Sequence, residues 1–309
     1  MRERFIAARE RLFAKSPTLR KAARIETELA RRVLDKNRPT LVKALWMESK
    51  VGALYTIVEG QEYLDTVAEH LAKRGSVLMY FNHTRKKDPV LAGHLTMDHL
   101  TPEDPSREED KRKKKKKPLA HVGAFGGLKH FDRDRSLLSK VQSSLIGEMQ
   151  KLLGFRMFLV IQPYDKQHYI DHPERIKPKT TRRFNYDAFN EGLDFIKQPG
   201  HVVLMDPSGT RQKDGVLMEP QAGVEELFIQ GGENVLALPV SFEPSRFRHL
   251  PTVRRVKMRI GKPVFLTEIK DEIQKETGEI EPPKGSIGKA LMRRLAHLLD
   301  EKYRGVHSN

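Results

Sequence analysis

The feature that most constrains the fold is an alternation, from residue 76 onward, of short apolar runs with segments of helical periodicity. Each run has the length of a buried strand and is too short to form a core helix of ordinary length. Strands that alternate with helices indicate an α/β fold with a mixed, partly parallel sheet flanked by helices. The predicted strands cover residues 76–81, 119–122, 156–161, 201–205, 235–242 and 253–260.

The first 72 residues have a different composition, rich in Ala, Arg, Leu and Glu with apolar positions at helical spacing. Pro17 and Pro39 divide this region into separate helices. We therefore predict a small N-terminal helical domain over residues 1–72 and an α/β domain over residues 73–309. Residues 101–118 combine prolines, acidic residues and a lysine-rich run, and we predict that they form an exposed basic insertion.

The chain is strongly basic, with a formal net charge of +16 and seven consecutive cations from Lys111 to Lys117. Such a field favours anionic partners: phosphorylated metabolites, acidic lipid headgroups, an acidic carrier protein or nucleic acid. A nucleic-acid-binding protein remains the alternative of another class. Only 7% of the residues are aromatic and none interrupts the basic run, so the composition disfavours nucleic acid as a partner. The run itself fits attraction to an anionic bilayer or carrier protein, and it fits a solvated loop equally well.

The composition also bears on the compartment. The chain has no cysteine, which excludes disulfides, thiolate metal ligands and a cysteine nucleophile. No apolar run approaches the roughly 20 residues of a membrane-spanning helix, and the charged amino-terminal segment is not typical of a signal peptide. We therefore expect a cytoplasmic protein, with peripheral attachment to the inner face of a membrane as a further option.

A histidine and an aspartate separated by four residues follow the first predicted strand. His83 comes just after residues 76–81, at the strand end where ligands bind in open α/β sheets. Asp88 precedes Pro89 and suits a helix N-cap. Across a strand-to-helix turn, the Asp88 carboxylate can orient the imidazole and stabilise the imidazolium formed when His83 takes a proton from a hydroxyl. A plain helix cap beside a loop histidine explains the same pattern.

A second polar block follows the predicted strand 201–205. The small residues Ser208, Gly209 and Thr210 permit close approach of a phosphate group. Arg211 can hold such a group with its planar fork, and Lys213 adds a second positive charge. A tight polar turn with solvated cations remains the other interpretation.

Three weaker signals accompany these blocks. Arg133 follows a glycine-rich stretch, Gly123 to Gly127, which we expect to bring backbone close to a ligand. Lys166 and His168 follow the predicted strand 156–161 and supply further cationic groups. Pro239 lies within the strand 235–242, whose side chains fit either the lining of an acyl pocket or plain core.

In this order the blocks resemble the glycerolipid acyltransferase superfamily. The matching features are Asn82-His83 with Asp88, Phe131-Asp132-Arg133, Pro207 to Arg211, and Leu238-Pro239-Val240. The superfamily usually has a glutamate where this chain has Ser208. The soluble, plastid-type glycerol-3-phosphate acyltransferases have a proline-serine-glycine sequence there, followed by basic residues, and this chain is most similar to them.

The resemblance implies a specific reaction. His83, oriented by Asp88, would deprotonate the sn-1 hydroxyl of glycerol-3-phosphate, which attacks the thioester of acyl-carrier protein or acyl-CoA directly. It implies phosphate binding by Lys166, His168, Arg211, Lys213 and Arg133, and a substrate pocket that includes Ser208, Gly209, Thr210 and Pro239. No metal or bound cofactor is required. Acylation of 1-acylglycerol-3-phosphate is the alternative within the same class.

Overall fold

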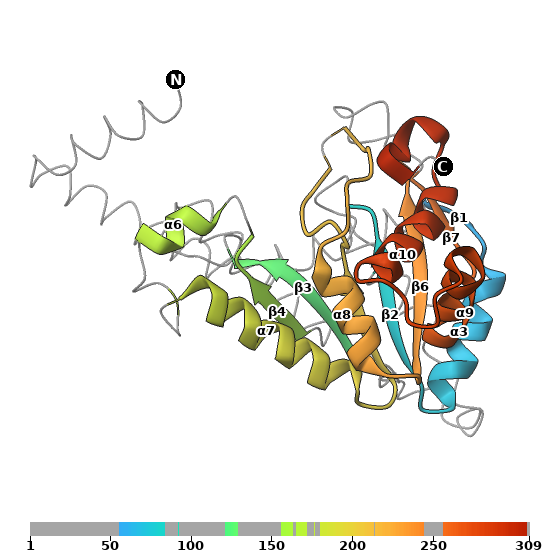
Figure 1. Cartoon of the computed structure of the whole chain (residues 1–309), viewed down its shortest axis with the longest axis horizontal. Coiled ribbons are helices and arrows are strands. Elements are labelled where there is room, and N and C mark those ends of the chain that lie inside the picture. Colours follow the sequence, from blue (N-terminus) through green and yellow to red (C-terminus); the bar gives the residue numbers. More distant parts are fainter. Residues whose placement is uncertain are drawn as a thin grey trace, which may run out of the picture. The chain divides into compact units, whose positions relative to one another are not determined.

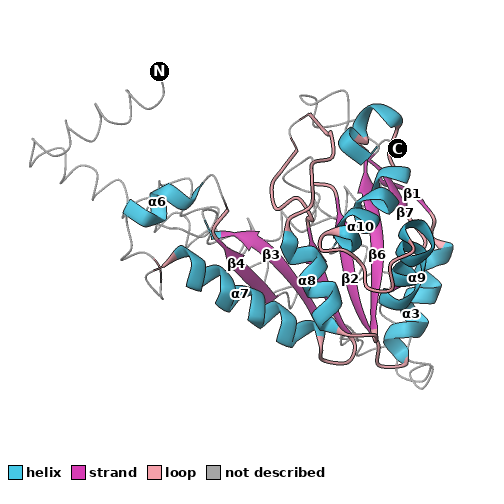
Figure 2. Ribbon diagram, in the orientation of Figure 1, coloured by secondary structure: helices cyan, strands magenta, loops and turns pink. Residues whose placement is uncertain are grey.

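The computed structural model describes residues 56–83, 92, 121–128, 156–162, 165–171, 176, 180–212, 214–243 and 256–307. These residues, coloured in Figure 1, fall within one of the two units into which the chain divides, and that unit alone is described below. Its architecture is a mixed, largely parallel sheet flanked by helices (Figure 2). The predicted α/β fold class is confirmed.

The sheet of the described part has eight strands. They are β1 (Thr56–Glu59), β2 (Ser76–Phe81), β3 (His121–Gly127), β4 (Arg156–Val160), β5 (His201–Met205), β6 (Val235–Phe242), β7 (Val256–Ile260) and β8 (Val264–Phe265). Seven follow the order β1-β7-β6-β2-β5-β3-β4, and β8 pairs with β6. The β6–β7 and β6–β8 pairs are antiparallel, whereas the other pairs are parallel.

The predicted strands at 76–81, 156–161, 201–205 and 235–242 correspond to β2, β4, β5 and β6. The glycine-rich stretch from Gly123 to Gly127 lies within β3 and pairs with β4. Close packing against aromatic rings explains why residue 123 is a glycine. A Cβ atom at Gly123 would lie 2.6 Å from the ring of Phe158 and 2.9 Å from that of Phe195.

Residues 56–72 also differ from expectation, since we placed them in the N-terminal helical domain. Residues Thr56–Glu59 pair in parallel with β7. Helix α3 (Glu62–Ala72) packs against the sheet through Leu64, Val67 and Leu71. This stretch therefore belongs to the α/β unit. The remainder of the predicted helical domain and the predicted insertion at 101–118 lie outside the described residues, so both stay predictions.

Strand β2 lies near the centre of the sheet, between β5 and β6, and all six of its residues are buried. A strand that is covered on both faces favours a continuous apolar run, which accounts for Val-Leu-Met-Tyr-Phe after Ser76, whose buried hydroxyl donates to the carbonyl oxygen of Gln198 at 2.8 Å. Its side chains alternate between two hydrophobic clusters. Leu78 and Tyr80 enter one cluster, whereas Val77, Met79 and Phe81 enter the other.

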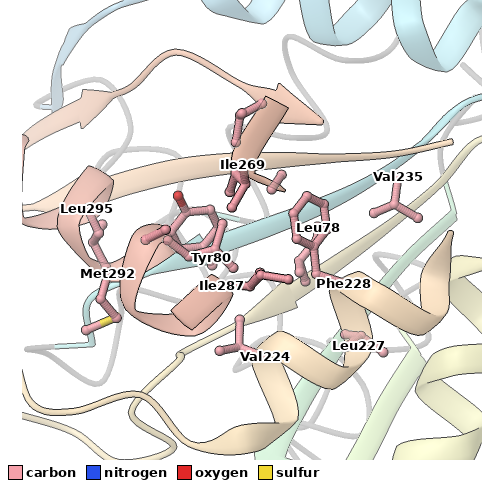
Figure 3. Close-up of a cluster of buried hydrophobic side chains, with 14 of the residues drawn as sticks. Leu78, Tyr80, Val224, Leu227, Phe228, Val235, Ile269, Ile287, Met292 and Leu295 are labelled. Atoms are coloured by element: carbon pink, nitrogen blue, oxygen red, sulfur yellow. The ribbon is translucent and has the colours of Figure 1, made fainter. Parts of the chain in front are cut away.

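Helices cover both faces of the sheet. Helix α3 contributes to the cluster that contains Met79. The opposite cluster contains residues of α7 (Thr181–Ile196), α8 (Ala222–Gly231), α9 (Leu266–Thr277) and α10 (Ser286–His297). Figure 3 shows Tyr80 in that cluster, near Ile287 and Met292 of α10. The remaining described helices are α6 (Lys166–Asp171), η5 (Glu301–Tyr303) and η6 (Gly305–His307).

The topology determines which loops meet. In the register of the parallel strands, Tyr80 of β2 pairs with Met205 of β5 and with Pro239 of β6. Because neighbouring parallel strands end at the same edge of a sheet, the segments that follow β2 and β5 leave side by side. These two segments carry His83 and the polar block that begins at Asp206.

Candidate functional site

Hydrogen bonds to strand β6 and to the segment after β5 fix the main chain around His83. The side-chain amide of Asn82 donates to the carbonyl oxygen of Phe242 at 3.0 Å, and its oxygen accepts from the Phe242 N–H at 2.7 Å. On the other side, the Gln212 N–H donates to the carbonyl oxygen of His83 at 2.8 Å. The backbone that leads to His83 is thereby attached to β6 and to the block after β5.

That block forms a compact turn. The Gly209 N–H donates to the Asp206 carbonyl oxygen at 3.0 Å, and Gly209 has a φ of +67°, which favours glycine. The Asp206 Oδ1 atom accepts from the N–H of Ser208 at 3.0 Å and from its hydroxyl at 2.8 Å. The Ser208 hydroxyl also accepts from the Gln212 side-chain amide. Ser208, a predicted pocket residue, is buried, and its hydroxyl bonds within the turn.

Asp206 is a site residue to which the sequence pattern assigned no role. Burial raises the pKa of its carboxyl from 3.8 to about 6, and its contacts with Ser208 and the charge of His83 oppose that rise. Its Oδ2 atom is buried and has no hydrogen-bond partner among the described residues. An acidic residue placed directly after a buried strand, beside the strand that leads to His83, is the signal that could have identified it.

Two predicted phosphate-binding cations belong to segments that meet. The side-chain amide of Gln162 donates to the carbonyl oxygen of Gly209 at 2.7 Å, which attaches the segment after β4 to the turn after β5. Helix α6 begins with Lys166, just beyond that attachment, and Arg211 follows the turn. Lys166 is exposed and Arg211 half-buried. Among the described residues, neither cation forms an ion pair.

Other predicted site residues are less informative. His168 is half-buried in α6, with its ring 5.1 Å from that of Tyr169 in an edge-on arrangement. Thr210 is half-buried in the turn. Three predicted residues, Asp88, Lys213 and Arg133, lie outside the described residues, so the predicted dyad partner of His83 stays a prediction.

Pro239 lies in the interior of the sheet. Its carbonyl oxygen accepts from the Gly261 N–H at 2.9 Å, and a Cβ atom at Gly261 would lie 2.8 Å from its ring. Strand β8 pairs with residues 236–237 of β6, and β7 pairs with residues 240–242. Pro239 lies between these two paired stretches, where neither β7 nor β8 pairs with it. A proline, which has no N–H to donate, is therefore tolerated at this position. Packing therefore accounts for Pro239 without a substrate pocket.

The described residues form no group of three or more histidine and acidic side chains that could hold a metal ion. Within the same ranges, none of the helices is both long and apolar enough to span a bilayer.

Comparison with known proteins gives little further information. No protein-family model matches the chain, and no curated protein matches its sequence. Among solved structures, the chain is similar to the crystal structure of the 1-acyl-sn-glycerophosphate (LPA) acyltransferase PlsC from Thermotoga maritima. The identity is 16% and the TM-score 0.39, over 85% of this chain and 82% of that chain. A likeness of this size is distant and assigns no activity to the chain.

Proposed function

We propose that the protein is a glycerolipid acyltransferase that transfers an acyl chain from a thioester to the sn-1 hydroxyl of glycerol-3-phosphate. The observation that supports this most is the bond from the Gln212 N–H to the His83 carbonyl oxygen. It joins the segment that carries a potential general base to the turn that carries the cation Arg211. Acyl transfer to a phosphorylated alcohol requires both a base for the hydroxyl and a cation for the phosphate.

In the proposed reaction, His83 accepts the proton of the acceptor hydroxyl while the hydroxyl oxygen attacks the thioester carbonyl carbon. The tetrahedral intermediate collapses, the carbon–sulfur bond breaks, and the departing thiolate takes the proton from His83. The new ester bond forms without a covalent enzyme intermediate. Asp88, five residues beyond His83, is the proposed partner that orients the imidazole. The mechanism needs no metal or bound cofactor, because the acyl-CoA or acyl-carrier protein is a co-substrate.

The phosphate would bind at the corner where the segments after β4 and β5 meet. Arg211 is suited to two parallel hydrogen bonds with phosphate oxygens, and Lys166 adds a point charge. His168, Lys213 and Arg133 complete the proposed set. The lysine-rich run at 111–117 is proposed to attract an acidic acyl-carrier protein or an anionic membrane surface. The proposed location is the cytoplasm, with peripheral membrane contact.

The test is an acyl-transfer assay with radiolabelled glycerol-3-phosphate, using acyl-CoA and, separately, acyl-carrier protein as donors. In the His83→Ala variant we expect kcat to fall by about 100- to 10,000-fold, the usual contribution of a general base. In Arg211→Gln we expect mainly a higher KM for glycerol-3-phosphate. Arg183→Gln is the matched control, because Arg183 is an exposed cation on α7 that pairs with Asp187 at 2.9 Å. Unchanged turnover in His83→Ala would overturn the proposal.

The same assay separates the two acceptors of this class. Each is supplied at equal concentration with a single acyl donor. Faster turnover of 1-acylglycerol-3-phosphate than of glycerol-3-phosphate would replace the proposed acceptor and leave the proposed chemistry in place.

A further inference from the structure

Two buried oxygen atoms close to His83 have no hydrogen-bond donor among the described residues. They are Oδ2 of Asp206 and Oε1 of Gln212. Each belongs to a group whose other polar atom is held by Ser208: Asp206 Oδ1 accepts from the Ser208 hydroxyl at 2.8 Å, and the Gln212 amide nitrogen donates to the same hydroxyl. Ser208 therefore fixes both groups and leaves two acceptors in one small region.

The position of this acceptor pair relative to His83 follows from two contacts. Gln212 bonds through its main chain to the His83 carbonyl oxygen at 2.8 Å. Asp206 follows β5, the strand paired with the one that leads to His83, and the charge of His83 acts on its carboxyl. The acceptor pair thus lies beside the proposed general base, and Arg211 follows it in the chain.

Two unpaired acceptors are costly for a folded protein. A buried acceptor without a donor destabilises the fold, and a charged acceptor does so more than a neutral one. Most buried polar groups in native proteins have a partner, so exceptions require an explanation such as a ligand or an ordered water. Both atoms here are acceptors, and one belongs to an acid. A complementary ligand must supply a hydrogen donor and bring no negative charge to this point.

A hydroxyl group fits that requirement. Glycerol-3-phosphate carries two neighbouring hydroxyls, of which the proposed reaction uses one. We propose that the second, non-reacting hydroxyl binds beside Gln212 and donates its single hydrogen bond to Oδ2 of Asp206, so that the site selects phosphorylated vicinal diols over phosphorylated alcohols with a single hydroxyl. This inference rests on the proposed function and makes it more specific. An acceptor such as 1-acylglycerol-3-phosphate has one free hydroxyl and would leave the acceptor pair unsatisfied.

The test compares two acceptors that differ only in the middle hydroxyl, sn-glycerol 3-phosphate and 3-hydroxypropyl phosphate. With the wild-type protein we expect kcat/KM to favour the diol by about 10- to 100-fold, the value of one hydrogen bond to a charged group. In Asp206→Asn, which keeps an oxygen for Ser208, this preference should fall by about tenfold, mainly through slower turnover of the diol. Damage to the fold would slow both acceptors equally and leave their ratio unchanged.

The matched control is Asp187→Asn, which makes the same chemical change at a half-buried position of helix α7. It should leave the preference at the wild-type value. Binding of both compounds and of inorganic phosphate is measured by calorimetry without an acyl donor, which separates this inference from the proposed function. A diol preference in binding that Asp206→Asn removes, without acyl transfer, would retain the hydroxyl site and overturn the proposed function.

Two other outcomes would overturn the inference. If acyl transfer occurs and the two acceptors react equally well with the wild-type protein, the acceptor pair does not bind a substrate hydroxyl and the proposed function stands. If neither compound binds and no transfer occurs, both proposals fail.

Discussion

The side chain of Asn82 pairs with the main chain of Phe242 through two hydrogen bonds, of 3.0 Å and 2.7 Å. Asn82 is fully buried and directly precedes His83. Its amide continues the sheet pairing of β2 with β6 for one position beyond the last strand residue, because it provides the donor and the acceptor that a backbone neighbour would provide. The placement of His83 therefore depends on a side chain that has no part in the proposed chemistry.

The first prediction concerns Asn82→Ala. The substitution leaves a buried N–H and a buried carbonyl of Phe242 without partners, and each unpaired group costs about 1–3 kcal/mol. We expect the free energy of unfolding, measured with urea, to fall by about 2–4 kcal/mol. Asn234→Ala is the control, because the Asn234 amide makes one exposed bond, to Arg74, at the other end of β6. An equal loss in both variants would contradict this role of Asn82.

The second prediction concerns the start of α10. Both carboxylate oxygens of Glu225, on α8, accept main-chain N–H groups at 2.8 Å, one from Gly285 and one from Gly288. These N–H groups belong to the first turn, where a helix has no internal acceptors and favours negative charge. Glu225→Ala should lower the free energy of unfolding by about 1–2 kcal/mol. The exposed neighbour Glu226 provides the control, since Glu226→Gln should have little effect in the same urea titration.

Apolar patterning was sufficient to predict the centre of the fold. Parallel strands buried on both faces require continuous apolar runs, and β2, β5 and β6 coincide with the runs read from the sequence. Apolar patterning was less informative for β3, because the predicted strand ended at residue 122 and the observed strand continues through the glycines to Gly127. Glycine there makes room for neighbouring side chains, and this requirement depends on strands that are distant in the sequence.

In the candidate site, too, the sequence pattern predicted positions along the chain and did not predict contacts between distant residues. The position of His83 at a strand end was predictable because it follows a clear apolar run. The importance of Asp206 was not, since its burial and its lack of a donor for Oδ2 arise from three-dimensional packing. Ser208 was predicted to face a substrate, whereas its hydroxyl bonds to Asp206, a contact set by the turn geometry. Sequence patterns therefore located the edge of the sheet and did not determine the hydrogen bonds within it.

The third prediction concerns Tyr80. Its hydroxyl is fully buried without a hydrogen-bond partner among the described residues, and burial raises its pKa well above the ordinary value. Because the hydroxyl gains no bond on folding, Tyr80→Phe should leave the free energy of unfolding unchanged or raise it by up to about 1 kcal/mol. Tyr80→Ala, which leaves a cavity, should lower it by about 3–5 kcal/mol. A loss above 1 kcal/mol in Tyr80→Phe would indicate that an ordered water binds the hydroxyl.

The fourth prediction concerns the stability cost of Asp206. Its pKa is about 6 in the folded protein and 3.8 in its ordinary state, so the folded protein holds the proton more tightly between these values. The free energy of unfolding therefore falls as pH rises from 4 to 6, by about 2–3 kcal/mol from this group, and the full cost is present above pH 6. Asp206→Asn should be more stable than the wild type at pH 8 and lose that advantage near pH 4. Thermal unfolding at several pH values measures the difference, with Asp187→Asn as the control.

The last prediction concerns His201, whose ring lies 4.9 Å from that of His121 and 4.2 Å from that of Phe195. Burial lowers the pKa of His201 below its ordinary value of 6.5, and the charges of His121 and Arg156 lower it further. The unfolded chain therefore takes up a proton more readily than the folded protein does, and stability from this group is lost as pH falls below 6.5 toward the folded pKa. In His201→Phe, which cannot titrate, the loss of unfolding free energy between pH 7 and pH 5 should be smaller than in the wild type. Equal losses in the two proteins, measured by urea unfolding at both pH values, would show that His201 does not sense pH.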